Sequence, residues 1–124
     1  MTRILLEQDR KTGEMELKGN ALLDKHGLHD WCISFENLRN ALYAPNEGDR
    51  GFWGQCDFEN KVIRIDWRIG RRFRQTMLHE IAHALVGEPG HGEEWIKKAA
   101  EIGCTGKELY RYRRQIESQT PETA

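Results

Sequence analysis

The chain has 124 residues, of which 38% are hydrophobic and 31% are charged, and its formal net charge is −1. This length and composition predict one globular domain over residues 1–124 with a well-solvated surface. A net charge so close to zero creates no overall field that attracts nucleic acid or an anionic membrane. Binding of either partner would therefore need a local patch of charge.

The N-terminus and the cysteines indicate an intracellular protein. The apolar run Ile4–Leu6 is far too short for the core of a signal peptide, and no stretch approaches the ~20 apolar residues of a membrane span. The three cysteines are odd in number and form no C-x-x-C motif, which excludes a zinc ribbon and a thioredoxin-like redox pair. We therefore expect a cytoplasmic location, no membrane partner, and reduced, buried thiols.

The first part of the chain predicts a helix followed by short strands. Apolar residues at near-helical spacing predict a helix over 14–27, because Gly27 is a typical helix end. Aromatic and branched residues predict strands over 31–35 and 40–44, and the turn formers of 45–51 predict a loop.

A β-hairpin is predicted next. Segments 51–58 and 61–67 alternate in polarity, and Glu59-Asn60 between them favours a tight turn. The second strand should alternate between two faces, one with Val62, Arg64 and Asp66 and the other with Ile63, Ile65 and Trp67.

The last part of the chain predicts three helices, over 71–87, 92–103 and 107–118. The first has an apolar stripe and should end near Gly87, since Pro89 cannot continue it. The third is basic and exposed. Together these elements predict an α+β fold in which a small antiparallel sheet packs against helix 71–87 and flanking helices, with its core within 14–103.

His79, Glu80 and His83 form an H-E-x-x-H motif inside a strongly apolar helix. Residues four apart lie on one helix face with Cβ atoms ~5–6 Å apart, so both imidazoles can reach one ion at ~2.0–2.1 Å. Glu80 is rotated by about 100°, which suits a base beside a metal-bound water better than a ligand. Without such a partner, burial of these three groups would cost several kcal/mol.

A catalytic zinc ion usually has three protein ligands, so one more is needed. His91 is the best candidate, because the turn between Gly87 and Gly90 can fold the chain back. The carboxylates of Glu88, Glu93 and Glu94 are weaker substitutes, and His26 and His29 are interpreted as ordinary loop residues. In the alternative without metal, the motif histidines are satisfied core or surface residues and Glu80 pairs with Arg72 or Arg74.

The blocks HEIAHAL (79–85) and HGEEW (91–95), with the preceding hairpin, resemble the SprT-like zinc metallopeptidases, which include the Spartan-type proteases that degrade proteins crosslinked to DNA. The resemblance implies one zinc ion held by His79, His83 and His91, Glu80 as general base, and a protein or peptide substrate. The link between the second and third histidines is short, and the C-terminal zinc ribbon of some members is missing. The ImmA-like metallopeptidases carry similar helices and are a rival resemblance.

The leading hypothesis from the sequence is therefore a zinc-dependent peptidase. Strand Val62–Trp67 is expected to offer its edge to an extended substrate, and Tyr110, Tyr112 or an arginine to stabilise the oxyanion. A second hypothesis is a DNA-associated module with a structural zinc, which would use the basic helix 107–118 and the arginines before the zinc helix. These arginines are Arg68, Arg71, Arg72 and Arg74. A third is a zincin that has lost activity and serves as a binding partner.

Overall fold

The computed structural model describes residues 3–38, 53–105, 109 and 114. The strand predicted over 40–44, the loop 45–51 and all but two residues of helix 107–118 lie outside the described residues, as do Tyr110 and Tyr112.

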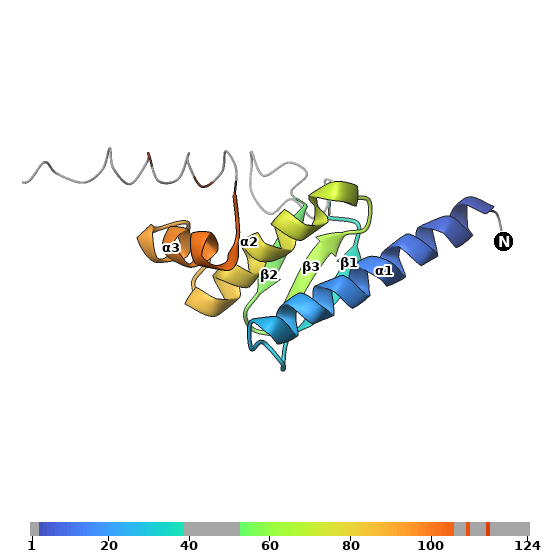
Figure 1. The fold of residues 1–124 in the computed structure, drawn as a ribbon. Coiled ribbons are helices and arrows are strands. Elements are labelled where there is room, and N and C mark those ends of the chain that lie inside the picture. Colours follow the sequence, from blue (N-terminus) through green and yellow to red (C-terminus); the bar gives the residue numbers. More distant parts are fainter. Residues whose placement is uncertain (1–2, 39–52, 106–108, 110–113, 115–124) are drawn as a thin grey trace, which may run out of the picture.

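A three-stranded sheet forms the centre of the described fold (Figure 1). Its strands are β1 (Cys32–Glu36), β2 (Gly54–Asp57) and β3 (Val62–Asp66), in the spatial order β1-β3-β2. β2 and β3 form the predicted antiparallel hairpin, whereas β1 runs parallel to β3. The α+β prediction is confirmed, but the sheet is mixed and not antiparallel throughout. The reason is topological: the hairpin places β2 outside β3, so β3 returns beside β1 in the same direction.

The two faces of the sheet follow the predicted alternation, with one exception. Ile63 and Ile65 are fully buried on the inner face, while Arg64 on the outer face pairs with Glu36 of β1 and Asp57 of β2. Asp66 was expected on the outer face with Arg64, yet its side chain is fully buried, and the Arg68 guanidinium binds it at 3.1 Å. This ion pair joins the end of β3 to the next segment.

The helices are α1 (Arg3–Lys25), the short 3-10 helix η2 (Gly70–Arg72), α2 (Phe73–Val86) and α3 (Glu93–Ile102). The predicted ends of α2 and α3 are confirmed, because Gly87 and Gly103 adopt left-handed backbone angles with φ of 82° and 105°. Helix α1 begins eleven residues earlier than the predicted 14–27. The segment before Gly13 contains good helix formers and no proline, so helix propensity extends α1 beyond its periodic part.

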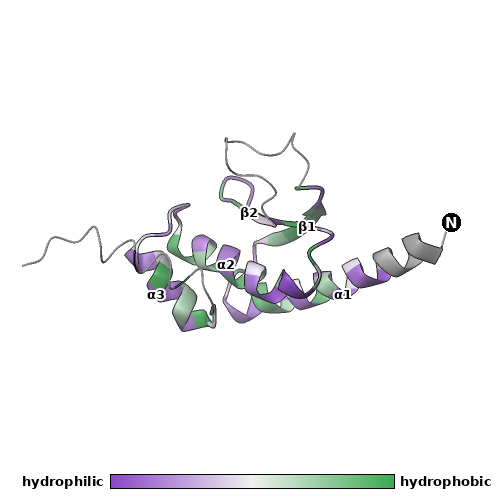
Figure 2. Ribbon diagram, turned by 90° about the horizontal axis from the view of Figure 1, so that it is seen from above, coloured by the Kyte–Doolittle hydropathy of each residue, from purple (hydrophilic) through white to green (hydrophobic). Residues whose placement is uncertain are grey.

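Helices α1 and α2 cover the same face of the sheet, and α3 packs against α2 (Figures 1 and 2). Gly19 allows α1 to pack closely, because a Cβ there would lie 2.8 Å from the Ile33 side chain and 3.2 Å from that of Phe73. The core joins residues of all these elements, among them Leu23, Ile63, Met77, Leu78, Ile81 and Trp95. Helix α2 therefore lies between the sheet, α1 and α3, while its first turn stays exposed at Arg74 and Gln75.

No helix among the described residues combines the length and apolar character that crossing a membrane requires.

Candidate metal centre

Helix α2 brings two histidines of the motif to one face, as their spacing predicts. The ring centroids of His79 and His83 are 5.0 Å apart. His83 is buried, and the His79 side chain retains 15% of its exposure. One imidazole of the pair is therefore embedded in the protein, and the other reaches its surface.

His91 joins them because the chain turns back after α2. The left-handed Gly87 ends the helix, and the turn that contains Pro89 returns the chain before α3 begins. The His91 Nε2 atom lies 3.0 Å from Nε2 of His79 and 3.1 Å from Nε2 of His83. Nitrogens that bind one tetrahedral zinc at ~2.0–2.1 Å are about 3.3 Å apart, so this spacing is close to that of a ligand set.

Within the part of the chain that the structure describes, these histidines form a group of residues that could hold a metal ion. Their ligand atoms all lie within 4.8 Å of one another. The Glu88 carboxylate, considered as a substitute ligand from the sequence, is not part of this group; the residue contributes its backbone carbonyl instead. His29 lies elsewhere and pairs with Asp24 at 3.2 Å. The identity of the ion stays a prediction.

The environment of His83 orients its ring for metal binding. Its Nδ1 lies 3.0 Å from the backbone carbonyl of Glu88. A carbonyl only accepts hydrogen bonds, so Nδ1 carries the proton and Nε2 keeps its lone pair towards the other two histidines. Hydrogen bonds of this kind fix the tautomer and orientation of metal-binding histidines. The turn after α2 thus positions His91 and also orients His83.

Trp95 of α3 forms the wall behind the histidines. Its side chain is 1% exposed, and its indole N–H donates a hydrogen bond to the backbone carbonyl of His79 at 3.2 Å. Its ring centroid is 4.7 Å from that of His79, 4.7 Å from that of His91 and 5.4 Å from that of His83. From the sequence, Trp95 was part of the HGEEW block and of the apolar face of its helix, but its contact with the three histidines was not predicted. Its position four residues after His91 was the available signal for a second role.

Glu80 is buried beside the histidines, with Oε2 at 4.0 Å from Nε2 of His79. Strand β2 lies against it at Gly54, where a Cβ would meet Glu80 Oε2 at 3.1 Å and the Thr76 methyl at 2.7 Å. Any larger residue at this position would have to displace Thr76 and press on the carboxylate. Gly54 therefore leaves the space that the Glu80 side chain occupies, a role that sequence reasoning missed.

Cys56 is the next residue of β2 on the inner face. Burial, followed by the negative charges of Glu80 and Asp57, raises the pKa of its thiol to about 12. The thiol is therefore protonated at neutral pH and is a poor nucleophile and metal ligand. The expectation of buried thiols holds for Cys104, whereas Cys56 is half-buried and Cys32 is exposed.

The prediction that strand Val62–Trp67 offers its edge to an extended substrate is wrong. Strand β3 is the central strand and is hydrogen-bonded to β1 on one side and to β2 on the other, so it has no edge to offer. Among the described strands, β2 is the edge strand that lies against α2. The sequence pattern located the hairpin but not which of its strands is outermost.

Comparisons with known proteins add no family to this picture: no family model, no curated protein and no solved structure matches the chain. What the structure shows at this site is a group of three histidines that could hold a metal ion. The likeness to SprT-like peptidases rests on the sequence motifs alone.

Proposed function

We propose that this protein is a zinc-dependent metallopeptidase of the SprT-like type. The observation that carries the proposal is the convergence of the His79, His83 and His91 Nε2 atoms beside the buried Glu80 carboxylate. A glutamate next to a three-histidine cluster has the composition of a hydrolytic zinc site, in which three protein ligands leave one coordination position for water.

Several features of the cluster favour zinc as the ion. Neutral imidazoles are good zinc ligands, and the hydrogen bond from His83 to the Glu88 carbonyl keeps that imidazole in the required tautomer. A structural zinc site usually has four protein ligands, whereas three histidines make up this group. We infer that the remaining position faces solvent on the side of His79, whose side chain is 15% exposed.

In the proposed reaction, zinc would lower the pKa of a bound water towards ~7 and polarise the scissile carbonyl. The Glu80 carboxylate would take a proton from the water as the water oxygen attacks the carbonyl carbon, and would deliver it to the nitrogen of the leaving amine as the C–N bond breaks. Its burial between α2 and β2 limits competing bulk water and holds it in one orientation. Trp95 supports the histidine rings from behind and takes no part in proton transfer.

An extended peptide substrate would lie along β2. Backbone N–H and C=O groups on an outer strand edge can hydrogen-bond an added strand. Gly54 of β2 is adjacent to Glu80, so a peptide paired with this strand would pass close to the general base. Side chains of the substrate would then alternate between the protein and solvent.

Two of the four arginines on which the DNA-associated alternative rested interact within the protein, whereas Arg71 and Arg74 are exposed. Arg68, one of the arginines on which it rested, is bound to the buried Asp66 and to the side chain of Asn37. The Arg72 guanidinium lies over the Trp53 ring at 5.7 Å. An ImmA-like peptidase would share the proposed zinc chemistry and differ in its protein substrate.

The test combines metal analysis with proteolysis of an unfolded protein such as casein. We expect about one zinc per wild-type chain, loss of that zinc in His91→Ala, and retention of it in Glu80→Gln with a ~10²–10⁴-fold lower rate. His29→Ala is the matched control and should keep both metal and activity, because His29 is exposed and pairs with Asp24. Full activity in Glu80→Gln would overturn the general base, and zinc retained by His91→Ala would overturn the ligand set.

A further inference from the structure

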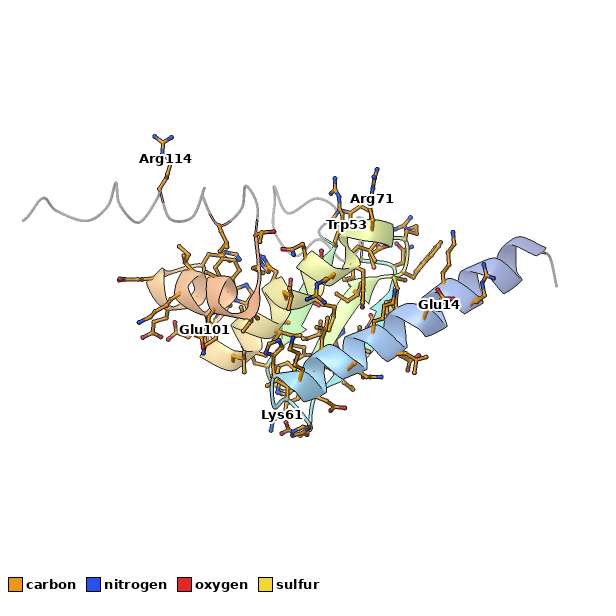
Figure 3. All side chains as sticks on the ribbon, viewed as in Figure 1. Glu14, Trp53, Lys61, Arg71, Glu101 and Arg114 are labelled. Carbon is orange, nitrogen blue, oxygen red and sulfur yellow. The ribbon has the colours of Figure 1, made fainter. Side chains whose placement is uncertain are left out.

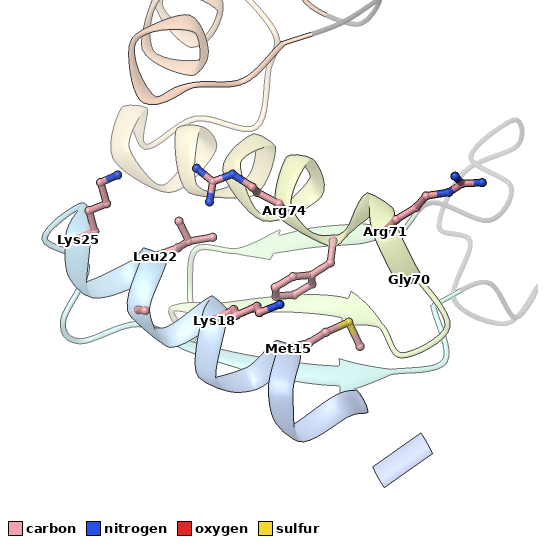
Figure 4. A pocket seen from close by; sticks show the side chains of 9 residues that line it. Met15, Lys18, Leu22, Lys25, Gly70, Arg71 and Arg74 are labelled. Carbon is pink, nitrogen blue, oxygen red and sulfur yellow. The ribbon is translucent and has the colours of Figure 1, made fainter. Parts of the chain in front are cut away.

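A groove of about 610 Å³ lies between α1 and the beginning of α2, away from the histidines (Figure 4). From α1 it is lined by residues between Met15 and Lys25, which cover about 15 Å of helix length. The opposite side is formed by residues 70–74, in η2 and the first turn of α2. Its volume lies within the ~300–1,000 Å³ that is typical of sites for small molecules.

The charged lining of this groove has one sign. Of the residues that line it, four are cations and none is acidic. The cations are Lys18, Lys25, Arg71 and Arg74. All four are exposed, and none forms an ion pair with a carboxylate of the described residues. Arg71 of η2 projects outward from the ribbon (Figure 3). The groove therefore concentrates positive potential in a protein whose net charge is only −1.

A neighbouring histidine shows the same positive potential. Partial burial lowers the pKa of His26, and the nearby charges of Lys25, Arg74 and Lys98 lower it further. Two of these cations belong to the groove. The Nε2 atom of His26 is also buried without a hydrogen-bond partner among the described residues. An additional positive charge is thus disfavoured in this region, and a negative one is favoured.

The interior of the groove is apolar. Leu22 and Phe73 are 8% and 5% exposed and belong to the core, and the half-buried Met15 packs against that core. A bare inorganic anion would satisfy the cations but would leave this apolar surface in contact with water. A ligand with a charged group and an apolar body would satisfy both.

We propose that this groove binds an amphipathic organic anion, of the class of a medium-chain carboxylate. The charged group would lie among the lysine and arginine side chains at the rim, and the apolar body along Met15, Leu22 and Phe73. An extended chain of about ten to twelve carbons matches the ~15 Å of α1 that lines the groove. This site is separate from the histidine cluster, and its existence does not depend on peptidase activity.

The test uses the full chain and the fluorescent anion 8-anilinonaphthalene-1-sulfonate, with dodecanoate and acetate as competitors. We expect one saturable site for the probe, displaced by dodecanoate at concentrations about tenfold or more below those of acetate. The variant Lys18→Glu/Arg74→Glu should bind the probe about tenfold more weakly, because it reverses two charges at the rim. The matched control Lys11→Glu/Lys97→Glu makes the same change of charge at exposed positions outside the groove, and should stay within about twofold of wild type.

Three outcomes would overturn the proposal. Equal weakening in the two double variants would show that only net charge matters. If acetate displaced the probe as effectively as dodecanoate, the apolar body of the proposed ligand would make no contribution to binding. Displacement of the probe by a single-stranded oligonucleotide, but not by dodecanoate, would assign the cations to nucleic acid instead. Circular dichroism and thermal unfolding of every variant establish that only folded proteins are compared. The substituted positions are exposed, so we expect these changes to alter the free energy of unfolding little.

Discussion

Helix α2 has two parts that differ in how their polar and charged side chains are placed. One is its beginning around Arg74, and the other, here called the histidine end, runs from His79 to Val86. Around His79, Glu80 and His83, polar groups are buried or half-buried, and contacts with β2, the turn after α2 and Trp95 fix their positions. Around Arg74, the cations stay exposed and have no carboxylate partner among the described residues. Burial demands that each polar group is satisfied, which produces a single geometry, whereas exposed cations stay hydrated and adaptable. The histidine end therefore suits the proposed metal chemistry, and the end around Arg74 suits the proposed binding of a charged ligand.

If the two ends are independent, damage to the histidine end should leave the groove intact. The largest effect is expected for Trp95→Ala, which removes a fully buried ring and the hydrogen bond to the His79 carbonyl. We expect a loss of about 3–5 kcal/mol in the free energy of unfolding, measured by urea denaturation. Trp31→Ala, at a half-buried ring, should cost clearly less. Equal losses in the two variants would contradict a special packing role for Trp95.

Metal removal should also act on the histidine end alone. An ion that binds only the folded chain stabilises it by ~2.7 kcal/mol at a free concentration one hundred times the Kd. We therefore expect zinc to raise Tm, a chelator to reverse the rise, and His83→Ala to abolish it. Binding of the groove probe should be unchanged by zinc. A rise in Tm that persists in His83→Ala would mean that zinc binds elsewhere.

Gly54→Ala separates the role of Glu80 from that of the three histidines, because it should displace the Glu80 side chain without changing a proposed ligand. The added Cβ would lie 2.7 Å from the Thr76 methyl and 3.1 Å from Glu80 Oε2. We expect zinc binding to be retained and the rate of casein hydrolysis to fall by about 10–100-fold, since a small displacement of a catalytic group has effects of this size. Gly13→Ala, where a Cβ would have no neighbour within 4 Å, is the control. Adding Thr76→Ser to Gly54→Ala removes the clashing methyl and should restore part of the rate; no restoration would argue against this steric cause.

The smallest effect concerns the outer face of the sheet, which α1 and α2 do not cover. Hydrogen bonds from Asn60, and then from Arg64, lower the pKa of Asp57 below its usual value. The stabilisation is therefore present above the pKa of the unfolded chain, about 3.9, and is lost as pH falls towards the folded pKa. We expect Asp57→Asn to be less stable than wild type at pH 7, with a difference that shrinks between pH 5 and pH 2 in urea denaturation. Glu59→Gln, at an exposed neighbour, should show no such convergence.

Local patterns were sufficient for most helix and strand positions. Alternation predicted β2 and β3, and the glycines at 87 and 103 predicted where α2 and α3 end, because left-handed backbone angles strongly favour glycine. The extent of α1 was underestimated, since its first part has propensity without apolar periodicity. The α+β class followed from the order of elements. The parallel pairing of β1 with β3 did not, because strand order depends on contacts between segments distant in the chain.

The sequence by itself determined the chemical inventory: two histidines one helical turn apart, a glutamate between them, and a third histidine after a turn. Spacing along a helix is enough for His79 and His83, because a regular backbone converts sequence distance into spatial distance. Only the tertiary structure decided that His91 Nε2 approaches both, that Trp95 and Gly54 enclose the group, and that β2 is the outer strand beside α2. These arrangements arise from packing between elements, which no local pattern of residues encodes.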